Sequence, residues 1–303
     1  MTKQTCGDSA THAVVPEAEP PQARLESVWA QTSRGLLGRL SMRLAETLLV
    51  AMLSSALMPA ASAAGQAAPT VAGSSGLVAA ANATPLPLLI VDAGATDPAA
   101  LYGALSGVVA ADARAPNRFT WDVGRGEVAD AVGEGVATVL GGDLEAQLAR
   151  VQGVIDKWTV LRALERLGDH LGLDTRVEPD TRVHHDGERL TVVVGGYRRP
   201  YFTLLNLASD GTVNFIYPMD QGSLHDSLTV PPGGEYRLPL QVTAPFGADH
   251  FIAIASATAL TELHQALKAI DGQMEAASIL ELFDRTLAGQ DYQLGVQAVF
   301  SAR

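Results

Sequence analysis

The sequence predicts an α+β protein, with a β-sandwich-like antiparallel domain packed against several helices. Three observations support this fold class. Apolar residues recur every three or four positions over 143–171, a helical period. From Arg189 onward the period changes to two, which is typical of strands. Glycine-rich turns separate these short segments, as in sandwiches and open barrels. Hydrophobic residues form 47% of the 303 residues, which is enough for one or two cores.

The clearest predicted helix covers residues 143–171. Asp143 can accept hydrogen bonds from the free N–H groups of the first turn. Gly168 and Gly172 provide stop signals. The apolar positions form one stripe, which we expect to face a core: Leu144, Leu148, Val151, Ile155, Trp158, Leu161, Leu164 and Leu167.

In the second half of the chain, alternating hydrophobicity predicts a series of strands, and a helical period then predicts two helices. Ser209–Gly211 is a strong hairpin signal, because glycine tolerates positive φ, and 231–234 marks another reversal. We expect residues 174–303 to form a β-rich domain with C-terminal helices. The predicted strands are 190–194, 201–207, 213–217, 236–242, 250–256 and 294–300, and the predicted helices are 260–270 and 276–287.

Residues 86–173 are expected to form a smaller α/β segment that includes the long helix. Within it, 118–123 alternates in hydrophobicity and predicts an exposed strand. Gly133 and Gly135 interrupt residues 128–140, so the pattern there fits neither a helix nor a strand clearly. Two further elements are predicted, a strand at 87–91 and a small helix at 98–110.

The sequence of the N-terminal region predicts an export signal rather than a folded domain. Residues 48–58 are a short apolar run, preceded by arginines and followed by small residues at 61–63. This is the pattern of a secretory signal peptide, and the run is too short to span a bilayer. We therefore expect residues 42–63 to be a signal peptide cleaved after Ala63, and the protein to be periplasmic or secreted. A buried amphipathic helix is the alternative.

The segments around this signal are expected to be unstructured. Residues 1–41 are polar, rich in proline and alanine, and without a period, which indicates a disordered tail or a mis-assigned translation start, with synthesis beginning at Met42. Residues 64–85 consist mainly of Ala, Gly, Ser and Pro and predict a flexible linker.

Charge and cysteine content exclude several functional classes. The formal net charge is −12, and an acidic chain without basic blocks is a poor ligand for nucleic acids. The single cysteine, Cys6, precedes the predicted cleavage site. The mature chain would then have no disulfide, thiolate metal site or cysteine nucleophile.

Two motifs resemble cofactor or metal sites but have simpler explanations. Gly124–Ala129 is similar to a dinucleotide-binding fingerprint, yet Glu127 would lie beside the phosphate, so a glycine-rich hairpin turn is favoured. His184–Asp186 could ligate a metal, but zinc needs three or four ligands, so a solvated polar turn is favoured. We expect no cofactor and no metal.

A hydrolytic site is an alternative that the sequence leaves open. Ser223, His225 and Asp226 have the residue types of a triad, but neighbours in one loop cannot easily align for proton transfer. Asp249 and His250 could form an acid–base pair with Ser223. More often, such a pair satisfies backbone groups where a strand begins. Trp121 and Trp158 are expected to be core or interface anchors.

The segment 201–218 (YFTLLNLASDGTVNFIYP), followed by 233–239 and 244–250, resembles the DUF4384 family. Residues 119–122, 153–158 and 183–188 extend a resemblance to the non-catalytic C-terminal half of bacterial caspase-family proteins, without the peptidase domain. The resemblance implies a fold and an accessory role but no binding residues. We therefore expect an exported, non-enzymatic binding or assembly module of the bacterial envelope, whose partner is a protein or envelope component. The alternatives are a regulatory partner or remnant of a caspase-like peptidase system, and a hydrolase using Ser223, His250 and Asp249.

Overall fold

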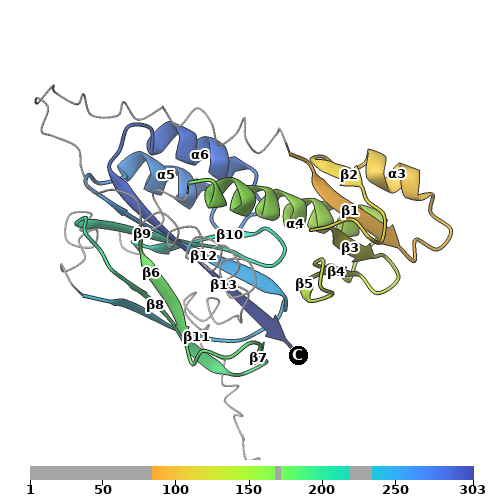
Figure 1. Ribbon diagram of the computed structural model, residues 1–303, viewed down its shortest axis with the longest axis horizontal. Coiled ribbons are helices and arrows are strands. Elements are labelled where there is room, and N and C mark those ends of the chain that lie inside the picture. The colour runs from red at the N-terminus through yellow and green to blue at the C-terminus, as the bar shows by residue number, and fades with distance from the viewer. Residues whose placement is uncertain (1–83, 168–171, 219–233) are drawn as a thin grey trace, which may run out of the picture.

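The computed structural model describes residues 84–167, 172–218 and 234–303 (Figure 1). The predicted tail, the signal peptide and nearly all of the linker lie outside this part of the chain, as does the segment with Ser223, His225 and Asp226. The described residues form several sheets and four helices, so the α+β class is confirmed. Among them, no helix is long and apolar enough to cross a membrane.

The first sheet contains five short strands in the order β2-β1-β3-β4-β5. β1 is parallel to β2 and β3, and the remaining pairs are antiparallel. The elements are β1 (Leu86–Val91), α3 (Pro98–Gly103), β2 (Val108–Ala110), β3 (Phe119–Asp122), β4 (Glu127–Ala129) and β5 (Gly135–Thr138).

This sheet corrects two predictions and confirms a third. The helix expected at 98–110 ends at Gly103, and its last residues form β2 instead. The strand expected to be exposed at 118–123 is half-buried, because Phe119 and Trp121 are 8% and 0% exposed. A hairpin joins β3 to β4 with Gly126 at φ +60, as expected of a glycine-rich turn.

The long helix α4 (Leu144–Glu165) lies between this sheet and the rest of the molecule (Figure 1). The Asp143 side chain accepts a hydrogen bond from the Ala146 N–H at 2.9 Å, which confirms the predicted cap. Val151, Val154 and Ile155 share a core cluster with the first sheet. Val160 and Leu164 belong to a second cluster, with β12 and the C-terminal helices. The helix therefore joins the two halves of the protein.

The central sheet has the order β10-β9-β12-β13-β7. All nine residues of β12 are buried, because β9 and β13 flank it over most of its length. The C-terminal helices cover one face of this sheet. The elements are β7 (His184–His185), β9 (Tyr201–Leu207), β10 (Val213–Tyr217), β12 (Ala248–Ser256), α5 (Thr261–Ala269), α6 (Ser278–Thr286) and β13 (Tyr292–Ala302).

A third sheet has the order β11-β8-β6, with β6 (Asp174–Glu178), β8 (Arg189–Gly195) and β11 (Tyr236–Gln241). It meets the central sheet on one side, where the Leu294 carbonyl of β13 accepts hydrogen bonds from the Gly172 and Leu173 N–H groups just before β6. On the other side β10 and β11 are edge strands, which are not paired with each other. We call the side of the described strands where β10 and β11 are not hydrogen-bonded to each other the open side.

Candidate functional site

The two residues of the predicted acid–base pair lie inside the protein. Asp249 and His250 are at the start of β12 and are only 3% and 4% exposed. The structure does not place Ser223, which lies outside the described residues. Both residues are therefore almost completely removed from solvent in this conformation.

Asp249 is held by neighbours from two other elements. Its carboxylate accepts a hydrogen bond from the Ser209 backbone N–H, in the turn between β9 and β10. Burial raises the pKa of Asp249, and the nearby charge of Lys157 opposes this shift. The expectation that the pair satisfies backbone groups where a strand begins holds only in part, because Asp249 accepts from the backbone of a neighbouring turn while the buried His250 Nδ1 has no hydrogen-bond partner among the described residues.

Lys157 of α4 is a buried cation that the sequence analysis missed. Its side chain is 0% exposed, although lysine is almost never fully buried. Its Nζ donates a hydrogen bond to the carbonyl of Ala248, the residue before Asp249. Burial lowers the pKa of Lys157, and the charges of Asp249 and Asp210 oppose this shift. A lysine in the middle of the long predicted helix, flanked by Val154, Ile155 and Trp158, was the available signal.

Two glycines allow this cluster to form. Gly153 lies one helical turn before Lys157, and a Cβ there would collide with the Asp210 carbonyl oxygen. Gly211, at φ +88, contacts the backbone of Gly153 in the same way. The close approach of α4 to the β9–β10 turn brings Asp210 toward Lys157. We call Lys157 and Asp249, together with the half-buried Asp210, the buried charge cluster.

His250 packs against a line of aromatic side chains. Its ring lies edge-on to Trp158 at 5.0 Å between centroids, and Trp158 contacts Phe119 at 5.1 Å. Burial, reinforced by the charge of Lys157, lowers the pKa of His250 well below its ordinary value. The imidazole is therefore neutral near neutral pH. The expected anchoring role of Trp158, and of the fully buried Trp121, is confirmed.

The histidine pair at 184–185 is not a solvated turn, so that prediction is wrong for His184. His184 is 1% exposed, and its ring contacts Glu188 at 3.2 Å and the Thr181 hydroxyl at 3.0 Å. It is buried because β7 pairs with the end of β13. In the part of the chain that the structure describes, no group of three or more His, Cys, Asp or Glu residues could hold a metal ion.

A cavity between the first sheet and α4 does not offer a polar ligand site. It has a volume of about 10 Å³, close to the smallest space that holds one water molecule, and its lining is apolar. The lining includes Leu88, Phe119, Val154 and Trp158. It is a packing defect of the core rather than a binding pocket.

Partly exposed aromatic side chains gather at the open side between β10 and β11. Tyr217 of β10 and Tyr236 of β11 contact each other at 5.2 Å between ring centroids. Both also contact Phe202, at 5.5 and 5.1 Å, and Tyr197 packs on Phe202 at 5.3 Å. Phe202 and Tyr197 are buried, whereas Tyr217 and Tyr236 keep part of their surface in solvent. We call these four residues the aromatic cluster.

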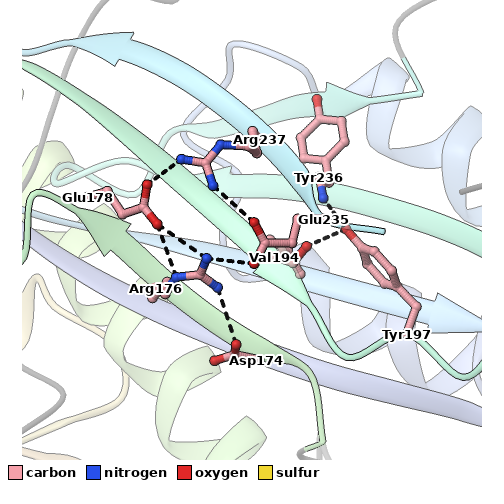
Figure 2. Close-up of polar contacts among 8 residues, drawn as sticks. All are labelled: Asp174, Arg176, Glu178, Val194, Tyr197, Glu235, Tyr236 and Arg237. Carbon is pink, nitrogen blue, oxygen red and sulfur yellow. Dashed lines mark hydrogen bonds and ion pairs between the residues drawn. The ribbon is translucent and has the colours of Figure 1, made fainter. Parts of the chain in front are cut away.

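The backbone holds the aromatic cluster in place. The Tyr197 hydroxyl donates a hydrogen bond to the Val194 carbonyl at 2.5 Å and accepts one from the Tyr236 N–H at 2.7 Å (Figure 2). Burial raises the pKa of Tyr236 to about 12 and also raises the pKa of Tyr217. Both phenols therefore stay protonated and can donate hydrogen bonds to a partner.

An exposed set of charges crosses the outer face of the third sheet beside this cluster (Figure 2). Arg176 contacts Glu235 at 2.6 Å, Glu178 at 3.2 Å and Asp174 at 3.3 Å. Arg237 contacts Glu235 at 3.0 Å and also pairs with Glu178. We call these five residues the ionic ladder. Because they are exposed, their pairing adds little to stability, but it fixes a pattern of charge next to Tyr236.

Comparison with known proteins identifies one family. Residues 183–259 match DUF4384, a domain of unknown function. Neither the curated proteins nor the solved structures include a match. The matched residues run from β7 through β12 and contain both the aromatic cluster and Asp249, but not β6, β13 or α4. The chain is therefore a protein that contains a DUF4384 domain.

Proposed function

We propose that this protein is an exported, non-enzymatic binding module of the bacterial envelope. Its partner is a protein or an envelope component, which it contacts through the aromatic cluster and the adjoining ionic ladder. Export rests on the signal-peptide pattern at 42–63. The non-enzymatic role rests on where the structure places the reactive side chains.

The observation that carries this proposal is a separation of two kinds of residue. Asp249, His250 and Lys157, which have suitable chemistry for catalysis, are enclosed between α4 and β12. Tyr217 and Tyr236, which have suitable chemistry for recognition, lie at the open side. Tyrosine is enriched at protein interfaces, because it combines a large apolar ring with a hydrogen-bonding group. The hydrolase alternative lacks such support, because its residues Asp249 and His250 are buried.

We further propose that the third sheet and the central sheet face each other as a β-sandwich. One core cluster contains side chains of both, among them Val192 and Val194 of β8 and Phe251 and Ala253 of β12. The β11 side chains on the inner face of this sheet are less protected from solvent, since Tyr236, Leu238 and Leu240 are only partly buried. A partner at this edge would complete the cover.

The proposal is tested by comparing what variants retain from the solubilised envelope of the native host. Replacing both Tyr217 and Tyr236 by serine should reduce the recovery of every specific partner at least about 30-fold, the effect of losing one hot spot of 2 kcal/mol. Glu262→Gln, which breaks an exposed ion pair with Arg285 on the helices, is the control and should retain the partner. Equal recovery by both variants would contradict the proposal, as would a wild-type protein that retains nothing.

A further inference from the structure

The outer edge of strand β11 is interrupted at its centre. Just after this strand, the Val242 N–H donates to the Glu188 carbonyl, so Val242 turns its backbone groups toward β8. The direction of these groups alternates along an antiparallel strand, so Arg237, Pro239 and Gln241 turn theirs toward the open side. Proline has no N–H. A strand added to this edge would therefore lack its central hydrogen-bond donor.

The outer edge of β10 is already occupied by the connection between α5 and α6. The Val213 N–H donates to the Gln273 carbonyl, and the Val213 carbonyl accepts from the Gly272 N–H, both at 2.8 Å. The Phe215 N–H donates to the Asp271 side chain, also at 2.8 Å. Neither β10 nor β11 thus offers the continuous row of backbone groups that strand addition requires. Recognition at the open side falls to side chains.

The rings of the aromatic cluster are set at angles to one another. Tyr217 and Tyr236 meet at an interplanar angle of 62°, and Phe202 is tilted against them by 45° and 44°. Such rings present edges as well as faces, unlike a flat stacking platform. Aromatic side chains are the means by which proteins bind proline-rich segments in the polyproline II conformation. That conformation has no internal hydrogen bonds, so its carbonyls can accept from the Tyr217 and Tyr236 hydroxyls.

The ionic ladder adds a preference for charge beside these rings (Figure 2). Its carboxylates belong to Asp174, Glu178 and Glu235, and its guanidinium groups to Arg176 and Arg237, so it carries one negative charge in excess. Both arginines are already paired within the ladder. Charge complementarity therefore favours a basic residue over an acidic one in the bound segment.

Resting on the binding role proposed above, we propose that the aromatic cluster binds a proline-rich segment of the partner in the polyproline II conformation, with a basic residue of that segment beside the ionic ladder. Pro239 keeps the edge of β11 from pairing with β-strands instead, as prolines do on the edge strands of other proteins. The site thus selects the conformation of its partner as well as its sequence.

Fluorescence anisotropy with the purified protein tests this directly. The probe is a fluorescein-labelled peptide of Ala-Pro-Pro repeats with an arginine at each end, and the matched peptide has Val-Thr repeats in place of the proline repeats. We expect saturable binding of the first peptide and at least about tenfold weaker binding of the second. The proposal is overturned if the proline-rich peptide shows no saturable binding, if both peptides bind equally, or if soluble peptidoglycan fragments bind instead.

Failure of this inference can be told apart from failure of the binding role itself. If the proline-rich peptide does not bind, but replacing Tyr217 and Tyr236 still abolishes recovery of the envelope partner, only the class of the bound segment is wrong. If the tyrosine variant also retains the partner, the binding role falls as well.

Three variants test the roles of individual residues. Tyr236→Ser should weaken binding of the proline-rich peptide at least about tenfold, as expected of a residue at the centre of an interface. Pro239→Val restores the missing N–H and should leave this affinity within about twofold, because the bound segment does not use the edge. Glu262→Gln, on α5, is the control and should bind like the wild type. Normal binding by Tyr236→Ser, or lost binding by Pro239→Val, would contradict the proposal. A variant that fails to fold leaves the comparison of the two peptides on wild-type protein intact.

Discussion

Gly153 of α4 packs directly against Gly211 of the β9–β10 turn, and neither position has space for a side chain. This contact lets the long helix approach the DUF4384 domain closely enough for Lys157 Nζ to reach the Ala248 carbonyl, within the influence of the charges of Asp249 and Asp210. The two halves of the structure therefore depend on each other, and the first prediction concerns this contact.

Gly153→Ala should destabilise the protein by about 2 kcal/mol or more, within the range for overpacking a well-packed contact. Helix propensity alone predicts the opposite sign, because alanine is favoured over glycine in a helix by about 1 kcal/mol. Gly103→Ala in α3, where a Cβ meets no atom within 4 Å, is the control and should be nearly neutral. Urea unfolding followed by tryptophan fluorescence measures both. A stabilised Gly153→Ala protein would show that the helix does not sit this close.

Lys157→Met should lower the free energy of unfolding by about 3–5 kcal/mol, the usual cost of leaving one partner of a buried pair behind. Without the amine, the Asp249 carboxyl group stays buried, with the Ser209 N–H as its hydrogen-bond donor. Adding Asp249→Asn should recover part of the loss, since the amide oxygen can still accept from Ser209 without carrying charge. Lys268→Met, at an exposed position, should change stability by less than about 0.5 kcal/mol. The same urea titrations measure all four proteins, and equal losses for the single and double variants would argue against coupling.

Stability should fall in mild acid because of His264 on α5. Burial lowers the pKa of His264 from 6.5 to about 4, and its Nε2 lies 2.7 Å from the Thr203 hydroxyl. The unfolded chain binds this proton more strongly than the folded one. The contribution is therefore complete above pH 6.5 and is lost as the pH falls through 4. Between pH 7 and pH 5 this residue should cost about 2 kcal/mol. His264→Gln should remove that part of the pH dependence. An identical pH profile for wild type and variant would contradict the assignment.

The segment that matches the family should not fold alone. Residues 183–259 include β12, whose nine residues all pair with β13, yet β13 begins at Tyr292. The isolated segment would expose this buried strand along one edge and leave Asp249 without Lys157. We expect its circular dichroism spectrum to be that of an unfolded chain, while residues 84–303 fold cooperatively. A cooperative unfolding transition for 183–259 would disprove this.

Much of the local structure could be predicted because its causes are local. The Asp143 cap, the Ser209–Gly211 hairpin and the periodic segments that became β8, β9 and α6 all depend on neighbouring residues. The first sheet was harder to predict, because the alternation of Phe119 and Trp121 does not show which strand pairs with β3. Parallel pairing with β1 depends on residues far away in the sequence.

The buried charge cluster could not be predicted from the stripe of large apolar residues on α4. Gly153 and Lys157 lie on a second face of the helix, which is buried because the β9–β10 turn packs at Gly153 and the start of β12 packs at Lys157. The aromatic cluster likewise depends on which edge strands lie next to each other in the fold, although β10 and β11 are not hydrogen-bonded to each other. Tyr217 and Tyr236 are separated by 18 intervening residues, and periodicity does not show that their rings touch.

Site-specific photocross-linking in the native host tests the binding role most directly. A photoreactive phenylalanine analogue at position 236 keeps the aromatic ring at the open side, and the same analogue at the exposed Gln265 of α5 is the control. We predict a discrete cross-linked partner in the periplasmic or envelope fraction from position 236 and none from position 265. Cross-links that are absent at 236, identical at both positions or confined to the cytoplasmic fraction would contradict the account.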